Sequence, residues 1–98
     1  MTALSSRADV RTDAPARYAK QLVPHLGRKA TFTQDADGGW TTVVGDARGR
    51  IVVGDGVLSL RVEAPDETLT RLEQAFGGHL ERFGARAELT VSWHRVTD

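Results

Sequence analysis

The sequence lacks cysteine, net charge and long apolar runs, and each absence excludes a class of protein. Without cysteine the chain forms no disulfide, iron–sulfur site or thiolate nucleophile, so a metal would need His, Asp or Glu ligands. Thirteen basic residues balance thirteen acidic ones, which argues against a dedicated nucleic-acid or membrane-surface binder. No apolar run approaches the roughly 20 residues that span a bilayer, and the first residues lack a signal-peptide core. We therefore expect a cytoplasmic protein.

The remaining composition is that of one small globular domain. The chain has 98 residues, of which 40% are hydrophobic and 27% are charged, enough for a single modest core. We expect residues 1–5 to form a flexible N-terminal tail and residues 6–98 to form a single α+β domain.

The first predicted helix opens at Asp13-Ala14-Pro15 and stops at Gly27. Thr12 or Asp13 is suited to cap it, and proline is favoured in a first helical turn. Pro24 removes an amide donor inside the helix, which predicts a kink or an early end. The expected apolar stripe is Ala19, Leu22, Val23 and Leu26.

The second predicted helix opens with Asp66 as its N-cap and closes in the segment His79–Gly84. Gly77 and Gly78 lie inside it, and each glycine costs about 1 kcal/mol relative to alanine. Close packing of a neighbouring element against Gly77 would explain that cost. The expected apolar stripe is Leu69, Leu72, Phe76, Leu80 and Phe83.

Alternation of apolar and polar residues predicts the strands. Gly45–Gly49 is expected to be a loop, whereas Gly54-Asp55-Gly56 between β-branched runs predicts a hairpin. The resulting order β-α-β-β-β-β-α-β fits an antiparallel sheet of five to six strands with two helices packed on one face. The strands are expected over Arg7–Thr12, Ala30–Thr33, Trp40–Val44, Ile51–Val53, Val57–Glu63 and Leu89–His94.

Both helices end on the pattern His-Leu-x-Arg, at residues 25–28 and 79–82. His79 lies about 50° from the centre of its apolar stripe, and Tyr18 and His25 share the corresponding flank of the first helix. If the helices lie antiparallel about a pseudo-two-fold axis, these flanks either face the groove between them or face away. In the first arrangement Tyr18, His25 and His79 converge on a ligand site, with Arg82 as an anion partner.

Two other roles for the histidines stay open. An imidazole near a helix C-terminus interacts favourably with the helix dipole, so His25 and His79 are also explained as structural residues. No His-x-x-x-His, His-x-His or Glu-x-x-His spacing occurs, which weakens a metal reading. We expect a non-catalytic small-ligand-binding or assembly module without a cofactor. The alternative is a small enzyme or metal-binding protein that uses His25 and His79.

The open face of the predicted sheet is basic. It lacks the stacking aromatics of nucleic-acid-binding sheets, because Phe32, Trp40 and Trp93 are predicted to point inward. We therefore favour a homodimer that forms through this face or a sheet edge over nucleic-acid binding, since small domains often gain stability by association. The side chains predicted on the open face are Arg7, Arg11, Arg61, Thr31, Thr33, Ser92 and His94.

Four segments resemble a bacterial family, number 2218 among the domains of unknown function. They are Thr12–Leu22, His25–Lys29, His79–Phe83 and Leu89–Arg95, and His-Leu-Glu-Arg-Phe is the most specific. The resemblance covers most of the chain beyond residue 6 and departs from the family pattern at Pro24 and Gly84.

Members of this family occur beside, or fused to, siderophore-interacting flavin reductases. The resemblance therefore implies an accessory role near iron–siderophore handling, with such a reductase or a small ligand as partner. It implies no catalytic residues, because no activity is established for the family.

Overall fold

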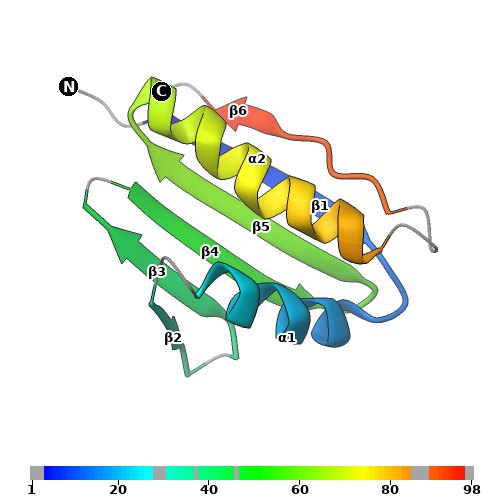
Figure 1. The fold of residues 1–98 in the computed structure, drawn as a ribbon. Helices are drawn as coiled ribbons and strands as arrows, with labels where there is room; N and C mark the ends of the chain where they lie inside the picture. Colours follow the sequence, from blue (N-terminus) through cyan, green and yellow to red (C-terminus); the bar gives the residue numbers. More distant parts are fainter. Residues whose placement is uncertain (1–3, 28–30, 37, 46, 85–88, 97–98) are drawn as a thin grey trace.

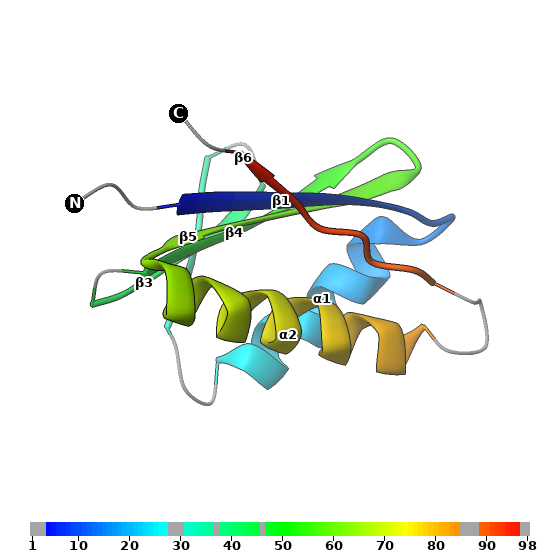
Figure 2. The same cartoon turned by 90° about the horizontal axis from the view of Figure 1, so that it is seen from above.

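A six-stranded antiparallel sheet is covered on one face by two helices (Figures 1 and 2). The computed structural model describes residues 4–27, 31–36, 38–45, 47–84 and 89–96. The expected fold class and element order are confirmed. The elements are β1 (Leu4–Arg11), α1 (Pro15–Leu26), β2 (Phe32–Gln34), β3 (Trp40–Val44), β4 (Ala47–Gly54), β5 (Val57–Ala64), α2 (Asp66–Phe83) and β6 (His94–Val96).

The strands lie in the order β2-β3-β4-β5-β1-β6, so the first strand is inserted between the fifth and the last. Gly54 pairs with Val57, and Gly56 has a positive φ of 69°, which confirms the predicted hairpin. β1 pairs from Leu4, opposite Ala64. The expected domain start at residue 6 therefore falls inside this strand.

The loop predicted over Gly45–Gly49 is wrong. Val44 pairs directly with Ala47, so β4 begins there and the last three residues of the expected loop belong to the sheet. Ala47 and Gly49 are buried because they face the helices, where little room is left for a side chain. The small residues Ala47 and Gly49, which resemble a loop in composition, are thus explained by the close approach of the helices to this strand.

The hydrophobic core lies between the sheet and the helices. Alternate residues of β1, β4 and β5 point at the helices, on what we call the packed face, and the other residues point to solvent, on the open face. The core side chains are Ala8, Val10, Ala19, Leu22, Ala47, Ile51, Leu58, Leu60, Val62, Ala64, Leu69, Phe76 and Leu80.

α1 continues through Pro24 to Leu26, so the predicted early end is wrong. Gly27 donates its backbone N–H to the carbonyl of Val23 at 2.8 Å, which keeps the last turn closed. At the other end, Ala14 rather than Thr12 or Asp13 occupies the N-cap position. Thr12 still contributes there, because its hydroxyl oxygen accepts a hydrogen bond from the Ala14 N–H at 3.1 Å.

α2 begins one residue before the predicted position. Asp66 is its first helical residue and Pro65 is the N-cap, whose carbonyl accepts the N–H of Leu69 at 2.9 Å. Proline fits this position because it has no N–H that would need a partner. Neither α2 nor α1 is long and apolar enough to cross a membrane, and the same holds throughout the described residues.

The last strand is shorter than predicted and shifted toward the C-terminus. Only His94–Val96 pairs with β1, whereas Leu89–Trp93 follows α2 (Figure 2). The Val91 N–H donates to the Glu81 carboxylate at 3.1 Å instead of to a strand. Side-chain alternation persists, with Leu89, Val91 and Trp93 packed inward, but the backbone has a helix rather than a strand as its neighbour. β2 starts at Phe32, while Ala30 lies outside the described residues.

Candidate functional site

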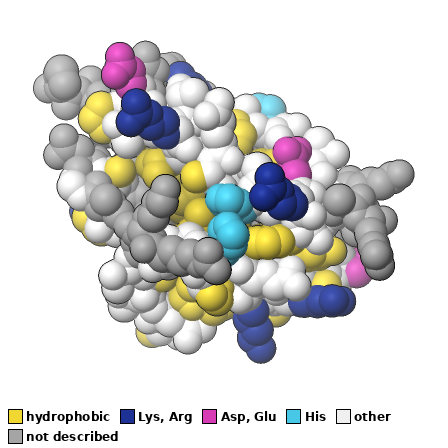
Figure 3. Space-filling view, in the orientation of Figure 1, with side chains coloured by type: hydrophobic (Ala, Val, Ile, Leu, Met, Phe, Trp, Pro, Cys, Tyr) yellow, Lys and Arg dark blue, Asp and Glu magenta, His cyan; other side chains and the backbone are white. Residues whose placement is uncertain are grey.

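The imidazoles of His25 and His79 are in contact. His25 comes from the last turn of α1 and His79 from α2, and their ring centroids lie 4.2 Å apart at an interplanar angle of 61°. The ring of Phe83 meets His25 edge-on, with centroids 5.4 Å apart. Both histidines are half-buried. Figure 3 shows two His side chains side by side at the molecular surface, in agreement with this ring contact. Of the two arrangements that the sequence left open, His25 and His79 therefore adopt the one in which they face each other between the helices.

A pocket of about 580 Å³ opens beside this histidine pair. It lies between the C-terminal end of α1, the middle of α2, and strands β2, β3 and β4. Figure 3 shows apolar surface next to the two histidines on this side of the molecule. The lining residues are His25, Leu26, Phe32, Thr42, Ala47, Arg48, Gly49, Thr68, Arg71, Leu72, Ala75, Phe76 and His79.

Phe76 forms an aromatic wall of the pocket, and a glycine makes room for it. A Cβ built at Gly49 would stand 2.5 Å from Cζ of Phe76, closer than real side chains approach. Phe32 packs against the same ring, with centroids 6.2 Å apart and planes tilted by 49°. Gly49 pairs with Thr42, which pairs with Phe32, so these three residues form one row of the packed face beneath Phe76.

The ionisable side chains that line the pocket are all basic. Among the described residues they are His25, His79 and Arg71, without a carboxylate. Arg48 also lines the pocket, but it alternates with Ala47 and Gly49 along β4, so its side chain projects from the open face of the sheet. Arg71 is exposed on α2 and is therefore the arginine available to a ligand. The pocket thus presents apolar walls and a basic edge.

Tyr18 and Arg82 do not line this pocket. Tyr18 is half-buried and packs against the hydrophobic core, two helical turns and about 10 Å along the axis from His25. Arg82 is exposed near the end of α2, about one turn beyond His79. The sequence analysis expected Tyr18 to converge with the two histidines, but the structure does not place it beside the pocket, because angular position does not specify distance along the helix axis. Phe76, Gly49 and Arg71 were not predicted as site residues. Arg71 and Phe76 share α2 with His79, at spacings of eight and three residues, so helical periodicity could have indicated them. Gly49 lies on β4, and its proximity to them depends on how the sheet packs on α2.

The described residues contain no group of three or more His, Cys, Asp or Glu side chains placed to hold a metal ion. His25 and His79 offer two imidazoles, whereas protein zinc sites use at least three protein ligands. Chemically, the histidine pair is suited to exchange protons or to hydrogen-bond with a bound molecule.

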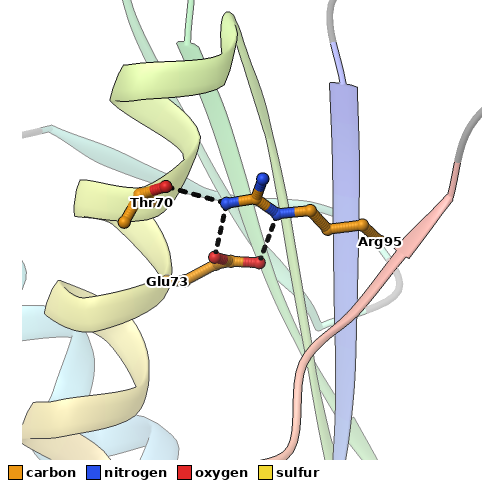
Figure 4. A network of polar contacts seen from close by, with 3 residues as sticks. All are labelled: Thr70, Glu73 and Arg95. Atoms are coloured by element: carbon orange, nitrogen blue, oxygen red, sulfur yellow. Dashed lines mark hydrogen bonds and ion pairs between the residues drawn. The ribbon is translucent and has the colours of Figure 1, made fainter.

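α2, which carries His79, is fastened to the edge of the sheet by Arg95 of β6 (Figure 4). The Arg95 guanidinium donates to both carboxylate oxygens of Glu73, at 3.1 and 3.3 Å, and to the Thr70 hydroxyl at 2.8 Å. Burial alone would raise the pKa of Glu73, but hydrogen bonding, chiefly from Arg95, and the charge of Arg95 together outweigh it and hold that pKa below its ordinary value. The bidentate pair therefore stabilises the helix that forms one wall of the pocket.

Comparisons with known proteins support the fold and identify a family. The chain is similar to the NMR structure of PA4090 from Pseudomonas aeruginosa, with a TM-score of 0.71 and 22% identity over 96% of each chain. At this identity the likeness shows a shared fold. No curated protein matches the chain. The model of the family described as "Uncharacterized protein conserved in bacteria (DUF2218)" matches residues 7–94, and the chain therefore belongs to this family.

Proposed function

We propose that the protein is a non-catalytic binding module whose small ligand occupies the pocket beside His25 and His79. The observation that carries the proposal is the pocket itself, a space of about 580 Å³ walled mainly by apolar side chains. Its volume falls within the roughly 300–1,000 Å³ of sites for small organic ligands.

The apolar side chains that line an open pocket stay in contact with water unless a ligand covers them. Removing apolar surface from water is favourable, so such a pocket favours a ligand with an apolar body. Here Leu72, Ala75 and Phe32 stay half-buried around the space instead of closing over it. A ligand with an aromatic or aliphatic body would cover these side chains.

The basic edge of the pocket favours a ligand that carries an acidic or hydrogen-bond-accepting group. Imidazole N–H and guanidinium groups donate to carboxylate, phenolate and hydroxyl oxygens. The family resemblance adds an iron–siderophore context, so aryl acids of the kind built into catecholate siderophores, and the ferric siderophores themselves, form the first ligand class to test. A siderophore-interacting reductase is the corresponding partner.

Heteronuclear NMR titration with 2,3-dihydroxybenzoate, and with ferric catecholate and hydroxamate siderophores, tests this proposal. We expect saturable shifts at His25, His79 and Phe76. Ala75→Phe should abolish them by filling the pocket, and His79→Ala should weaken binding roughly tenfold, as expected for a lost hydrogen bond to a charged group. Gln21→Ala, an exposed change on α1, is the matched control. Unchanged affinity in Ala75→Phe with the fold retained, or no shift with any probe, would overturn the proposal.

The contact between the imidazoles also supports a second candidate function, a small acid–base enzyme. A pair of histidines at the edge of a ligand pocket can accept and return a proton. Product analysis of each bound probe after incubation separates the two functions. A new product that disappears in both His25→Gln and His79→Gln supports the enzyme, whereas a bound probe recovered unchanged supports the binding module.

A further inference from the structure

A row of cations crosses the open face of the sheet, on the side away from the pocket. The strand register places Arg61 of β5 directly opposite Arg7 of β1 on one side and Arg50 of β4 on the other. His94 of β6 pairs with Arg7 and extends the row to the sheet edge. At the other end, Arg50 pairs with Thr41, which pairs with Thr33. This arginine row contains three arginines on three adjacent strands and no acidic residue.

Such an arrangement works against the stability of the sheet. Side chains that are directly opposite on neighbouring strands lie about 5 Å apart, and like charges at this distance are destabilising. Two of the arginines are partly neutralised from neighbouring positions: Arg7 by Asp9 at 3.3 Å and Arg50 by Asp35 at 3.4 Å. Arg61, in the centre, is exposed and has no carboxylate within ion-pair distance among the described residues. A local arrangement that opposes the fold is expected where it serves a function.

Two other occupants fit the open face less well. A symmetric dimer centred on the arginine row would place the row against its own copy, and the like charges would repel each other. Single-stranded nucleic acid binds through stacking on aromatic side chains. The aromatic residues of β2 and β3 lie on the packed face instead. Trp40 pairs with the buried Ile51, Phe32 pairs with the buried Thr42, and both aromatic side chains pack against the core.

We propose that the arginine row binds a small oligophosphate anion. Guanidinium groups form paired hydrogen bonds with phosphate oxygens, which makes arginine the usual side chain for this ligand class. Strands spaced about 4.8 Å apart spread the three guanidiniums over roughly 10 Å, which suits a chain of phosphates better than a single ion. Arg61 is the central contact, and the anion offsets the repulsion that the row creates.

Calorimetric titration with inorganic tripolyphosphate at low ionic strength tests this inference. We expect saturable binding that weakens as salt is raised and that falls about tenfold in Arg61→Gln, as for one lost charge-assisted hydrogen bond. Arg17→Gln removes the same charge from an exposed position on α1 and should bind as the parent does. Arg61→Lys should give an intermediate affinity, because lysine keeps the charge but loses the paired geometry.

Thermal unfolding without the anion gives an independent readout. Arg61→Gln should raise the midpoint temperature of unfolding relative to both the parent and Arg17→Gln, because it removes the central repulsion. A cooperative unfolding transition at that midpoint also shows that the Arg61→Gln variant is folded. No binding at low salt, equal affinity in Arg61→Gln and Arg17→Gln, or a lower midpoint in Arg61→Gln would overturn the inference. Tighter binding of a single-stranded oligonucleotide than of tripolyphosphate would also overturn it, in favour of nucleic acid.

Discussion

Gly77 lies against the indole of Trp93, with no room for a side chain between them. A Cβ at Gly77 would stand 2.8 Å from Nε1 of Trp93 and 3.1 Å from Cγ1 of Val91. The neighbouring Gly78 has nothing within 4 Å of the same position. The expectation that close packing explains Gly77 is therefore confirmed, and the two adjacent glycines have different physical roles in one helix.

This contrast predicts opposite effects of the same substitution. Gly77→Ala should destabilise the protein by about 1–3 kcal/mol, because Trp93 and Val91 must shift away from α2. Gly78→Ala should stabilise it by up to about 1 kcal/mol, because alanine favours the helix and meets no neighbour. Urea unfolding of both variants measures the difference. Equal shifts of the two unfolding midpoints would show that the segment 91–93 does not pack on Gly77.

Enlarging Gly49 should deform the pocket. In Gly49→Ala the new methyl displaces the ring of Phe76, and we expect a loss of about 1–3 kcal/mol in unfolding free energy together with weaker ligand binding. Phe76→Leu in the Gly49→Ala background should recover part of that loss, because leucine vacates the space of the ring. A double-mutant cycle by chemical denaturation measures the coupling free energy. Strict additivity of the two substitutions would contradict the contact between them.

Acid should weaken the attachment of α2 to β6. The pKa of Glu73 is lower in the folded protein than its ordinary value of 4.5, so its ionised form stabilises the fold above that pH, and this contribution is lost as pH falls through the lower folded value. Stability of Glu73→Gln should therefore depend less on pH in this acidic range than that of the parent. Glu67→Gln, an exposed change on the same helix, is the control. Identical acid profiles for Glu73→Gln and the parent would rule out the contribution.

The hydroxyl of Ser59 should control the titration of Asp9 on the open face. It donates to the Asp9 carboxylate at 2.8 Å and is the main cause that lowers the pKa of that group, ahead of the hydrogen bond and charge of Arg7. Ser59→Ala should raise the pKa of Asp9, as measured by the carboxyl ¹³C shift during an NMR titration. An unchanged titration curve would mean that Arg7 and His94, without Ser59, lower the pKa of Asp9.

Periodicity in the sequence was sufficient to predict the fold and half of the proposed site. The apolar stripes of the helices predicted the packed faces. The angular offset of His79 from its stripe left two arrangements open, and the structure shows the one in which His79 meets His25 of α1. Angular position does not specify height along a helix axis, and Tyr18 therefore lies about two turns from the pocket. The segment 89–93 shows a related limit, because alternating side chains occur both in a paired strand and in an extended segment that packs on a helix.

Features that depend on pairing between distant strands could not be predicted from the sequence. Arg7, Arg50 and Arg61 each lie on a solvent-facing strand position, and nothing in any one strand indicates that they are direct neighbours. Likewise, the need for a glycine at position 49 is evident only from the structure, in which the ring of Phe76 packs against it. The registers of β1 and β4 against β5 decide which arginines meet, and the packing of α2 on the sheet decides what lies against Gly49.

The insertion of β1 between β5 and β6 has a consequence for how the chain acquires its structure during synthesis. Both neighbours of this strand come later in the sequence, at Val57–Ala64 and His94–Val96. β1 therefore leaves the ribosome before either of its sheet partners and stays unpaired until β5 has emerged, and long-range pairings of this kind form slowly. The alternating charges of Arg7, Asp9 and Arg11 would keep that waiting strand from associating with other nascent chains.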